Sequence, residues 1–81
     1  QLREQILFFL KNSYEFFIVV ARDGVEFKPQ LPDEIVSSFS DDYISFALAG
    51  YSFQSAFVED NYLIFEAGFG EENIGAFVYV E

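Results

Sequence analysis

The side chains available for chemistry are carboxylates and hydroxyls, because the 81-residue chain contains neither histidine nor cysteine. A catalytic nucleophile needs an activating neighbour whose pKa suits neutral pH, and histidine most often fills that role. Lys11 or Lys28 could in principle activate a serine, but a solvated charge explains each of them better. Zinc sites built from thiolates and imidazoles are excluded for the same reason. We therefore expect a protein that is not an enzyme.

Acidic residues occur as adjacent pairs at Asp41-Asp42, Glu59-Asp60 and Glu71-Glu72. Two carboxylates can serve a glycosidase, and a spaced set can hold calcium. Neighbouring residues in a turn point apart, however, and the D-x-D-x-D-G loop is missing. We interpret the pairs as solvated turns and expect no metal and no cofactor; carboxylate catalysis stays a remote alternative.

The formal net charge is −10, and all of it lies after Lys28, where no basic residue occurs. Such a field repels nucleic acid and anionic membranes and attracts basic partners. One explanation is that the negative charge keeps an aromatic-rich chain in solution. The alternative is that the protein is an acidic inhibitor, which blocks a basic surface by mimicry. No apolar run approaches the roughly 18 residues of a membrane span.

The stretch Tyr62–Phe69 has the alternation of a β-strand. One face carries Leu63, Phe65, Ala67 and Phe69. Ala67 therefore leaves a dent between two rings, where another chain can lie. Tyr51, Phe53, Ala67 and Phe69 are candidates for a partly exposed apolar groove, and ordinary core positions are an equally good explanation of each.

The other elements follow from periodicity and turn signals. Residues 2–11 predict a helix whose apolar face is broader than one contact needs. It is either buried against two surfaces or shared with a second copy of the chain. Residues 14–22 predict a strand covered on both faces, joined to residues 25–28 by a hairpin at Asp23-Gly24. A short helix over 31–39 follows, and then a meander of strands over 43–49, 52–59, 62–69 and 74–80. Residues 1–81 thus predict one mainly β (α+β) domain, with an N-terminal helix before a small open antiparallel barrel.

The order and spacing of five segments resemble the SspB (stringent starvation protein B) family of proteolysis adaptors. These segments are Leu2–Leu10, Phe16-Phe17-Ile18 with Gly24-Val25-Glu26-Phe27, Tyr43–Ala49, Asp60–Gly70 and Ile74–Val80. The closest match is Asp60–Gly70, with its pattern apolar-x-Phe-x-Ala-x-Phe-Gly. Together the segments cover nearly the whole chain, although each alone is weak.

The resemblance implies an SH3- or Sm-like open barrel in the cytoplasm, whose groove captures extended peptide tags such as the ssrA tag and delivers the substrate to the ClpX unfoldase of ClpXP. By position it implies a small groove residue at Ala67, with Phe69, Gly70, Ala49 and Phe53 near it. It also implies a homodimer through the N-terminal helix, for which the apolar residues are Leu2, Ile6, Phe9 and Leu10. The family's unfoldase-docking tail has no counterpart before Glu81, and residues 30–42 differ in composition, so tag preference is not carried over.

Overall fold

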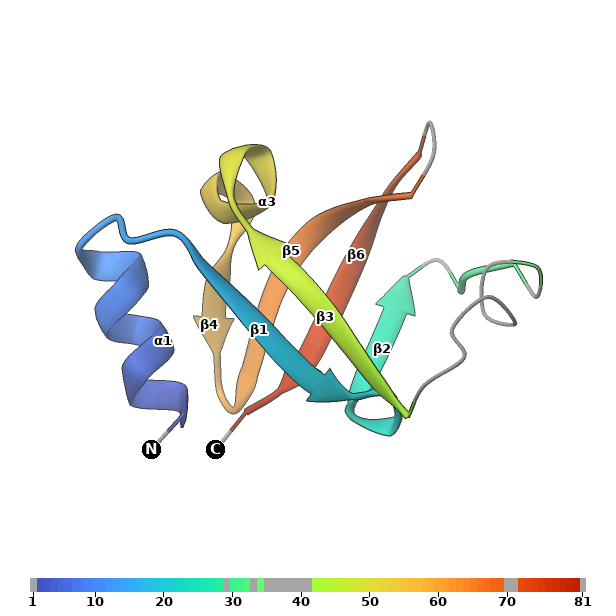
Figure 1. The fold of residues 1–81 in the computed structure, drawn as a ribbon, viewed down its shortest axis with the longest axis horizontal. Coiled ribbons are helices and arrows are strands. Elements are labelled where there is room, and N and C mark those ends of the chain that lie inside the picture. Colours follow the sequence, from blue (N-terminus) through green and yellow to red (C-terminus); the bar gives the residue numbers. More distant parts are fainter. Residues whose placement is uncertain (1, 29, 33, 35–41, 70–71, 81) are drawn as a thin grey trace.

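The computed structural model of the chain describes residues 2–28, 30–32, 34, 42–69 and 72–80 (Figure 1). Its elements are α1 (Leu2–Lys11), β1 (Phe16–Ala21), the 3₁₀ turn η1 (Arg22–Gly24), β2 (Val25–Lys28), β3 (Tyr43–Leu48), α3 (Gly50–Ser55), β4 (Phe57–Glu59), β5 (Tyr62–Phe69) and β6 (Glu72–Tyr79). The predicted class, mainly β with an N-terminal helix and antiparallel strands, is confirmed.

The strands form two open sheets. One has two strands in the order β1-β3, and the other has four in the order β2-β6-β5-β4; every pairing is antiparallel. In Figure 1 the two-stranded sheet crosses in front of β5 and β6. Each sheet turns its alternate side chains toward the other, which encloses one core.

The core lies between the sheets and is closed at one end by α1. Its fully enclosed members include Ile6 of α1, Leu48 of β3, Leu63 of β5 and Val78 of β6. Of the face of β5 that alternation groups together, Leu63, Phe65 and Ala67 are all buried, as core positions are. Residues far apart in the chain therefore share one apolar interior.

Helix α1 ends where the chain enters the left-handed region at Ser13, whose φ is 59°. The N–H of Tyr14 donates to Phe9 O at 2.8 Å, and that of Ser13 to Leu10 O at 3.3 Å. These two bonds satisfy carbonyls that the last helical turn would leave unpaired. The chain is thereby turned back into β1, beside which α1 lies.

The predicted hairpin at Asp23-Gly24 is wrong. A hairpin would pair Arg22 with Val25 in a ladder, but the N–H of Arg22 donates to Asp42 O at 2.8 Å and so extends the β1–β3 ladder. The 3₁₀ turn η1 then sends the chain into the other sheet, where β2 pairs with β6. Turn-forming residues marked the bend without indicating which strands it separates.

The prediction that the first strand is covered on both faces is also wrong, because Phe17 and Val19 of β1 are exposed. The predicted strand over 52–59 begins as helix α3 instead, and only Phe57–Glu59 pairs as a strand. Two serine side chains of α3 form hydrogen bonds with the backbone of β5, and these bonds fix the helix against that strand. The short helix predicted over 31–39 lies mostly outside the described residues.

Candidate functional site

The candidate site is a gap between the edges of β3 and β5, which we call the β3–β5 slot. It is a cavity of about 240 Å³ at which the two sheets separate. The described residues that line it are Ile44, Ser45, Phe46 and Ala47 of β3, Ser52 of α3, and Phe65, Ala67 and Gly68 of β5. None of these residues carries a charge.

Among the described residues no strand pairs with the edge of β3 that faces the slot. The bond from Arg22 N–H to Asp42 O fixes which residues of β3 pair with β1, since hydrogen-bonded pairs alternate along an antiparallel ladder. Ile44 and Phe46 therefore turn their backbone groups toward β1. Tyr43, Ser45 and Ala47 turn theirs away from β1, toward the free edge. Such an edge is a template for another extended chain.

Strand β5 is covered along part of the facing edge. The Ser52 hydroxyl donates to Glu66 O at 2.8 Å, and the N–H of Glu66 donates to Ser55 Oγ at 3.0 Å. Both backbone groups of Glu66 thus point away from β6 and are satisfied by α3. By the same alternation Gly68 also faces the slot, and no bond from it to another described residue occupies that side. Helix α3 thus also contributes Ser52 to the lining of the slot.

The floor of the slot is apolar. Ala67 lies there at 6% exposure, beside the edge-to-face pair of Phe46 and Phe65, whose ring centroids are 5.2 Å apart. A floor of this kind accepts small apolar side chains. The slot offers backbone donors and acceptors at its wall, and the described residues that line it include no carboxylate and no amine.

One titratable pair borders this region. The Tyr51 hydroxyl donates to the carboxylate of Glu66, and this hydrogen bond, followed by the negative charge of Glu66, raises the pKa of Tyr51 above its usual value of 10.0. The tyrosine therefore stays neutral at physiological pH. Its bond to Glu66 adds a side-chain link between α3 and β5 to the two serine links.

The structure places one predicted groove residue, Ala67, in the slot, whereas Ala49, Tyr51 and Phe53 are not among the described residues that line it. Ala49 is exposed before α3, and Tyr51 is exposed on that helix. Phe53 packs against the core, with its ring 6.4 Å from that of Phe16. Phe69 ends β5, but its side chain lies outside the described part of the chain, as does all of Gly70.

The residues predicted for the dimer contact are mostly used within the chain. Ile6 is 1% exposed and belongs to the core, so it is not available to a second copy. Leu10 packs against the core, and the ring of Phe9 lies 5.4 Å from that of Phe16. Only Leu2 of the predicted set is exposed. Contact within the chain therefore accounts for Ile6, Phe9 and Leu10, while Leu7 and Phe8 of the same helix remain exposed.

Sequence reasoning missed the wall of the slot, which is made by Ser45, Ala47, Ser52 and Gly68. Alternation predicted the strand that contains Ser45 and Ala47. It did not predict that one edge of this strand has no neighbour, because strand order depends on contacts between distant segments. The pattern over residues 52–59 predicts a strand, and a strand there gives no indication that the Ser52 hydroxyl bonds to the backbone of β5.

Other classes of site receive no support. Within the described ranges, no group of three or more acidic residues is arranged to hold a metal ion, and no helix there is long and apolar enough to cross a membrane. Neither a protein-family model, nor a curated protein, nor a solved structure shows significant similarity to the chain.

Proposed function

We propose that the protein binds extended peptide tags in the β3–β5 slot and acts as a non-enzymatic adaptor. In this proposal a tag such as the ssrA tag adds a strand to β3, and the bound substrate is delivered to the ClpX unfoldase of ClpXP in the cytoplasm. The resemblance to the SspB family suggests the recipient. The slot suggests how the tag is held.

The free edge of β3 beside an apolar floor is the observation that carries the proposal. Tyr43, Ser45 and Ala47 offer backbone groups at every second residue, which is the spacing that an added strand requires. Ala67 and the rings of Phe46 and Phe65 form the floor below. Main-chain pairing supplies affinity, and the floor selects small apolar side chains.

None of the described residues that line the slot carries a charge, which distinguishes this function from the acidic mimic. A peptide held by backbone pairing and apolar contact should bind with little dependence on salt. A basic partner attracted by the net charge of −10 should be released as salt screens the attraction. Binding measured at low and high salt therefore separates the two functions.

The proposal is tested by a proline at the edge of β3. The N–H of Ser45 points away from β1, so Ser45→Pro removes an edge donor without breaking the β1–β3 ladder. We expect fluorescence anisotropy to show a labelled ssrA-tag peptide binding about tenfold more weakly to this variant. Thermal unfolding should stay close to that of the wild type.

The matched control is Ser45→Ala, which alters the side chain and keeps the backbone donor; its affinity should lie within about twofold of wild type. Ala47→Pro provides a second edge variant at the next outward position. Equal binding by the two prolines and the wild type would exclude the edge of β3. Failure of the wild-type protein to bind either the tag or a library of extended peptides would overturn the function itself.

A further inference from the structure

The outer face of the two-stranded sheet is uncovered and apolar, and we call it the β1–β3 face. It consists of Phe17, Val19 and Ala21 from β1 and Tyr43, Ser45 and Ala47 from β3. Phe17 is 79% exposed, and Val19 and Tyr43 are each 65% exposed. None of the six residues is charged, in a chain whose net charge is −10. Exposed apolar surface of this kind marks an interaction site.

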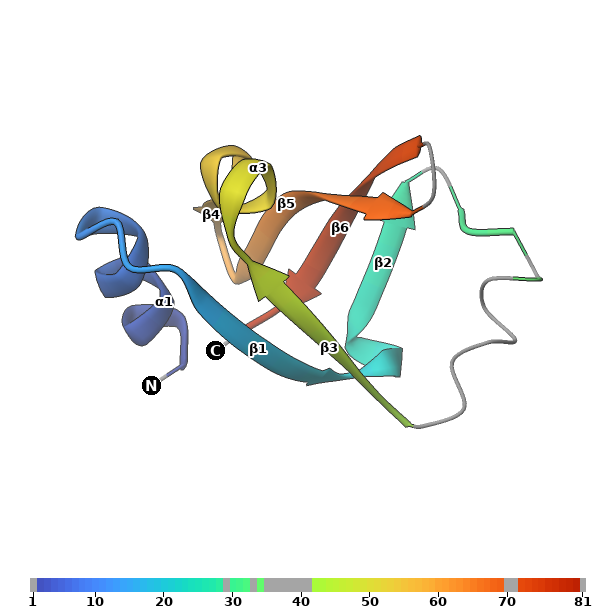
Figure 2. The same ribbon diagram turned by 45° about the horizontal axis from the view of Figure 1, so that its top comes forward.

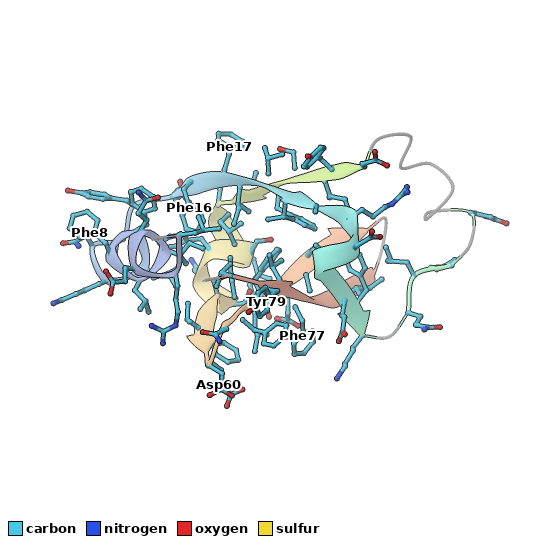
Figure 3. The ribbon with its side chains drawn as sticks, turned by 90° about the horizontal axis from the view of Figure 1, so that it is seen from below. Phe8, Phe16, Phe17, Asp60, Phe77 and Tyr79 are labelled. Atoms are coloured by element: carbon cyan, nitrogen blue, oxygen red, sulfur yellow. The ribbon has the colours of Figure 1, made fainter. Side chains whose placement is uncertain are left out.

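The position of this face leaves it open to a second molecule. Figure 2 shows α1 beside the start of β1 and not over the outside of β1 and β3. In Figure 3 Phe17 projects away from the body of the molecule, on the side opposite Phe77 and Tyr79 of the other sheet. No described element packs on Phe17 from outside.

The register of the two strands gives the face a self-complementary pattern. The residues directly opposite each other are Phe17 and Ala47, Val19 and Ser45, and Ala21 and Tyr43. Each ring is thus paired with an alanine, and the two rings occupy diagonal corners. A two-fold axis lying between two such faces, parallel to the strands, places Phe17 of one copy over Ala47 of the second. It also places Tyr43 over Ala21.

This arrangement meets the requirement of a two-fold contact, in which one patch must fit a copy of itself. Large residues over small ones allow two sheets to interdigitate at the usual spacing of about 10 Å. A basic partner is a poorer fit, because the face offers it no carboxylate. We propose that the β1–β3 face is the contact surface of a symmetric dimer of this chain.

The available area indicates the strength of the contact. An aromatic side chain contributes roughly 150–250 Å², so Phe17 and Tyr43 alone expose on the order of 200–350 Å² in each copy. A stable interface needs about 800 Å² from each partner. The two rings supply a substantial part of this area, and Val19 with the rest of the face adds to it. We therefore expect a dimer that dissociates on dilution.

Salt gives the dimer a distinctive signature. Two copies of charge −10 repel each other, and salt screens that repulsion while leaving the apolar contact in place. Association should therefore strengthen as salt is raised. A basic partner on the same face would show the opposite dependence.

The test is sedimentation velocity of the full chain over about a hundredfold range of concentration, at low and moderate salt. The wild type should change from monomer to dimer within that range. Val19→Lys places a charge at the centre of the face and its symmetry mate beside it, and we expect at least a tenfold weaker association. Phe8→Lys makes the same change of charge on the exposed side of α1 and should leave association unchanged.

Far-ultraviolet circular dichroism checks that both variants fold. Should Val19→Lys prove unfolded, Ser45→Lys tests the same centre from the neighbouring strand. A wild-type protein that remains monomeric at every concentration would overturn the proposal. Loss of the dimer in Phe8→Lys and its retention in Val19→Lys would assign the contact to α1 instead. Val19 lies outside the lining of the slot, so peptide binding measured on Val19→Lys separates the dimer from the adaptor function.

Discussion

The two sheets share one core but differ in how their outer faces are covered. On the four-stranded sheet Phe77 has Ile64 of β5 on one side and Glu26 of β2 on the other, and the ammonium of Lys28 lies 4.9 Å from its ring centroid. Tyr62 and Tyr79 pack edge to face at 5.6 Å. On the two-stranded sheet Phe17 has only Ala47 beside it.

The difference shows that the width of a sheet decides whether aromatic residues on its outer face can cover one another. A central strand has cross-strand neighbours on both sides, and each pair removes apolar area from water. Tyr79 is accordingly 46% exposed, against 79% for Phe17. Glu26, Lys28, Glu59 and Asp60 also border the wider face beside Phe77. The narrower face has neither aromatic neighbours across the strands nor charged residues of its own. For this reason we propose that a second copy covers it.

The largest expected effect tests whether the two sheets contribute equally to the shared core. Leu48 of β3 and Leu63 of β5 are both fully buried, so replacing either with alanine should lower the free energy of unfolding by about 2–5 kcal/mol. Urea denaturation followed by circular dichroism measures this. Phe17→Ala, on the exposed side of β1, is the control and should have much less effect in the monomer. A small loss for Leu48→Ala alone would mean that the narrow sheet is only loosely attached.

A smaller effect should separate the covered edge of β5 from the bare edge of β3. Ser55→Ala leaves the N–H of Glu66 without its acceptor in a half-buried position, which should lower the free energy of unfolding by about 1–2 kcal/mol. Ser45→Ala removes an exposed hydroxyl from β3 and should change it by less than about 0.5 kcal/mol. Equal effects in the denaturation curves would remove the distinction between the two edges.

Lys28 tests the charged cover of the wider sheet. Lys28→Gln removes the cation above Phe77, with an expected loss of about 0.5–1 kcal/mol. Lys28→Arg retains a cation and should preserve the stability. The melting temperatures of both variants measure the effect, and an unchanged Lys28→Gln protein would show that ring packing alone covers this face.

The smallest effect concerns pH. The folded-state pKa of Tyr51 is raised above its unfolded value of 10.0, so the folded protein holds this proton more tightly. Its contribution is fully present below pH 10 and is lost as pH rises past 10 through the folded pKa. Tyr51→Phe should abolish this dependence and leave the behaviour near neutral pH almost unchanged. Ultraviolet titration of the phenolate checks the direction of the shift.

Local pattern was sufficient to predict α1, β2, β3 and β5, because helical spacing, alternation and glycine-containing turns are properties of neighbouring residues. Local pattern did not predict which strands pair with each other. The Asp23-Gly24 pair suggested a hairpin, yet the sheet to which β2 belongs is decided by β6, far along the chain. Of the candidate site, alternation placed Ala67 on one face with Leu63 and Phe65, without deciding whether that face is core or groove. The free edge that faces it arises from the order of the strands.

That strand order affects how the chain folds while the ribosome is still synthesising it. Strand β6 lies between β2 and β5, although β2 is made early and β6 late. While synthesis continues, β2 has no strand to pair with, and its neighbour in the finished sheet does not yet exist. Pairing across so long an interval closes a large loop and is slow. The nascent chain is thus expected to complete its wider sheet only after β6 has left the exit tunnel, and a chaperone that shields β2 until then would raise the yield of folded protein.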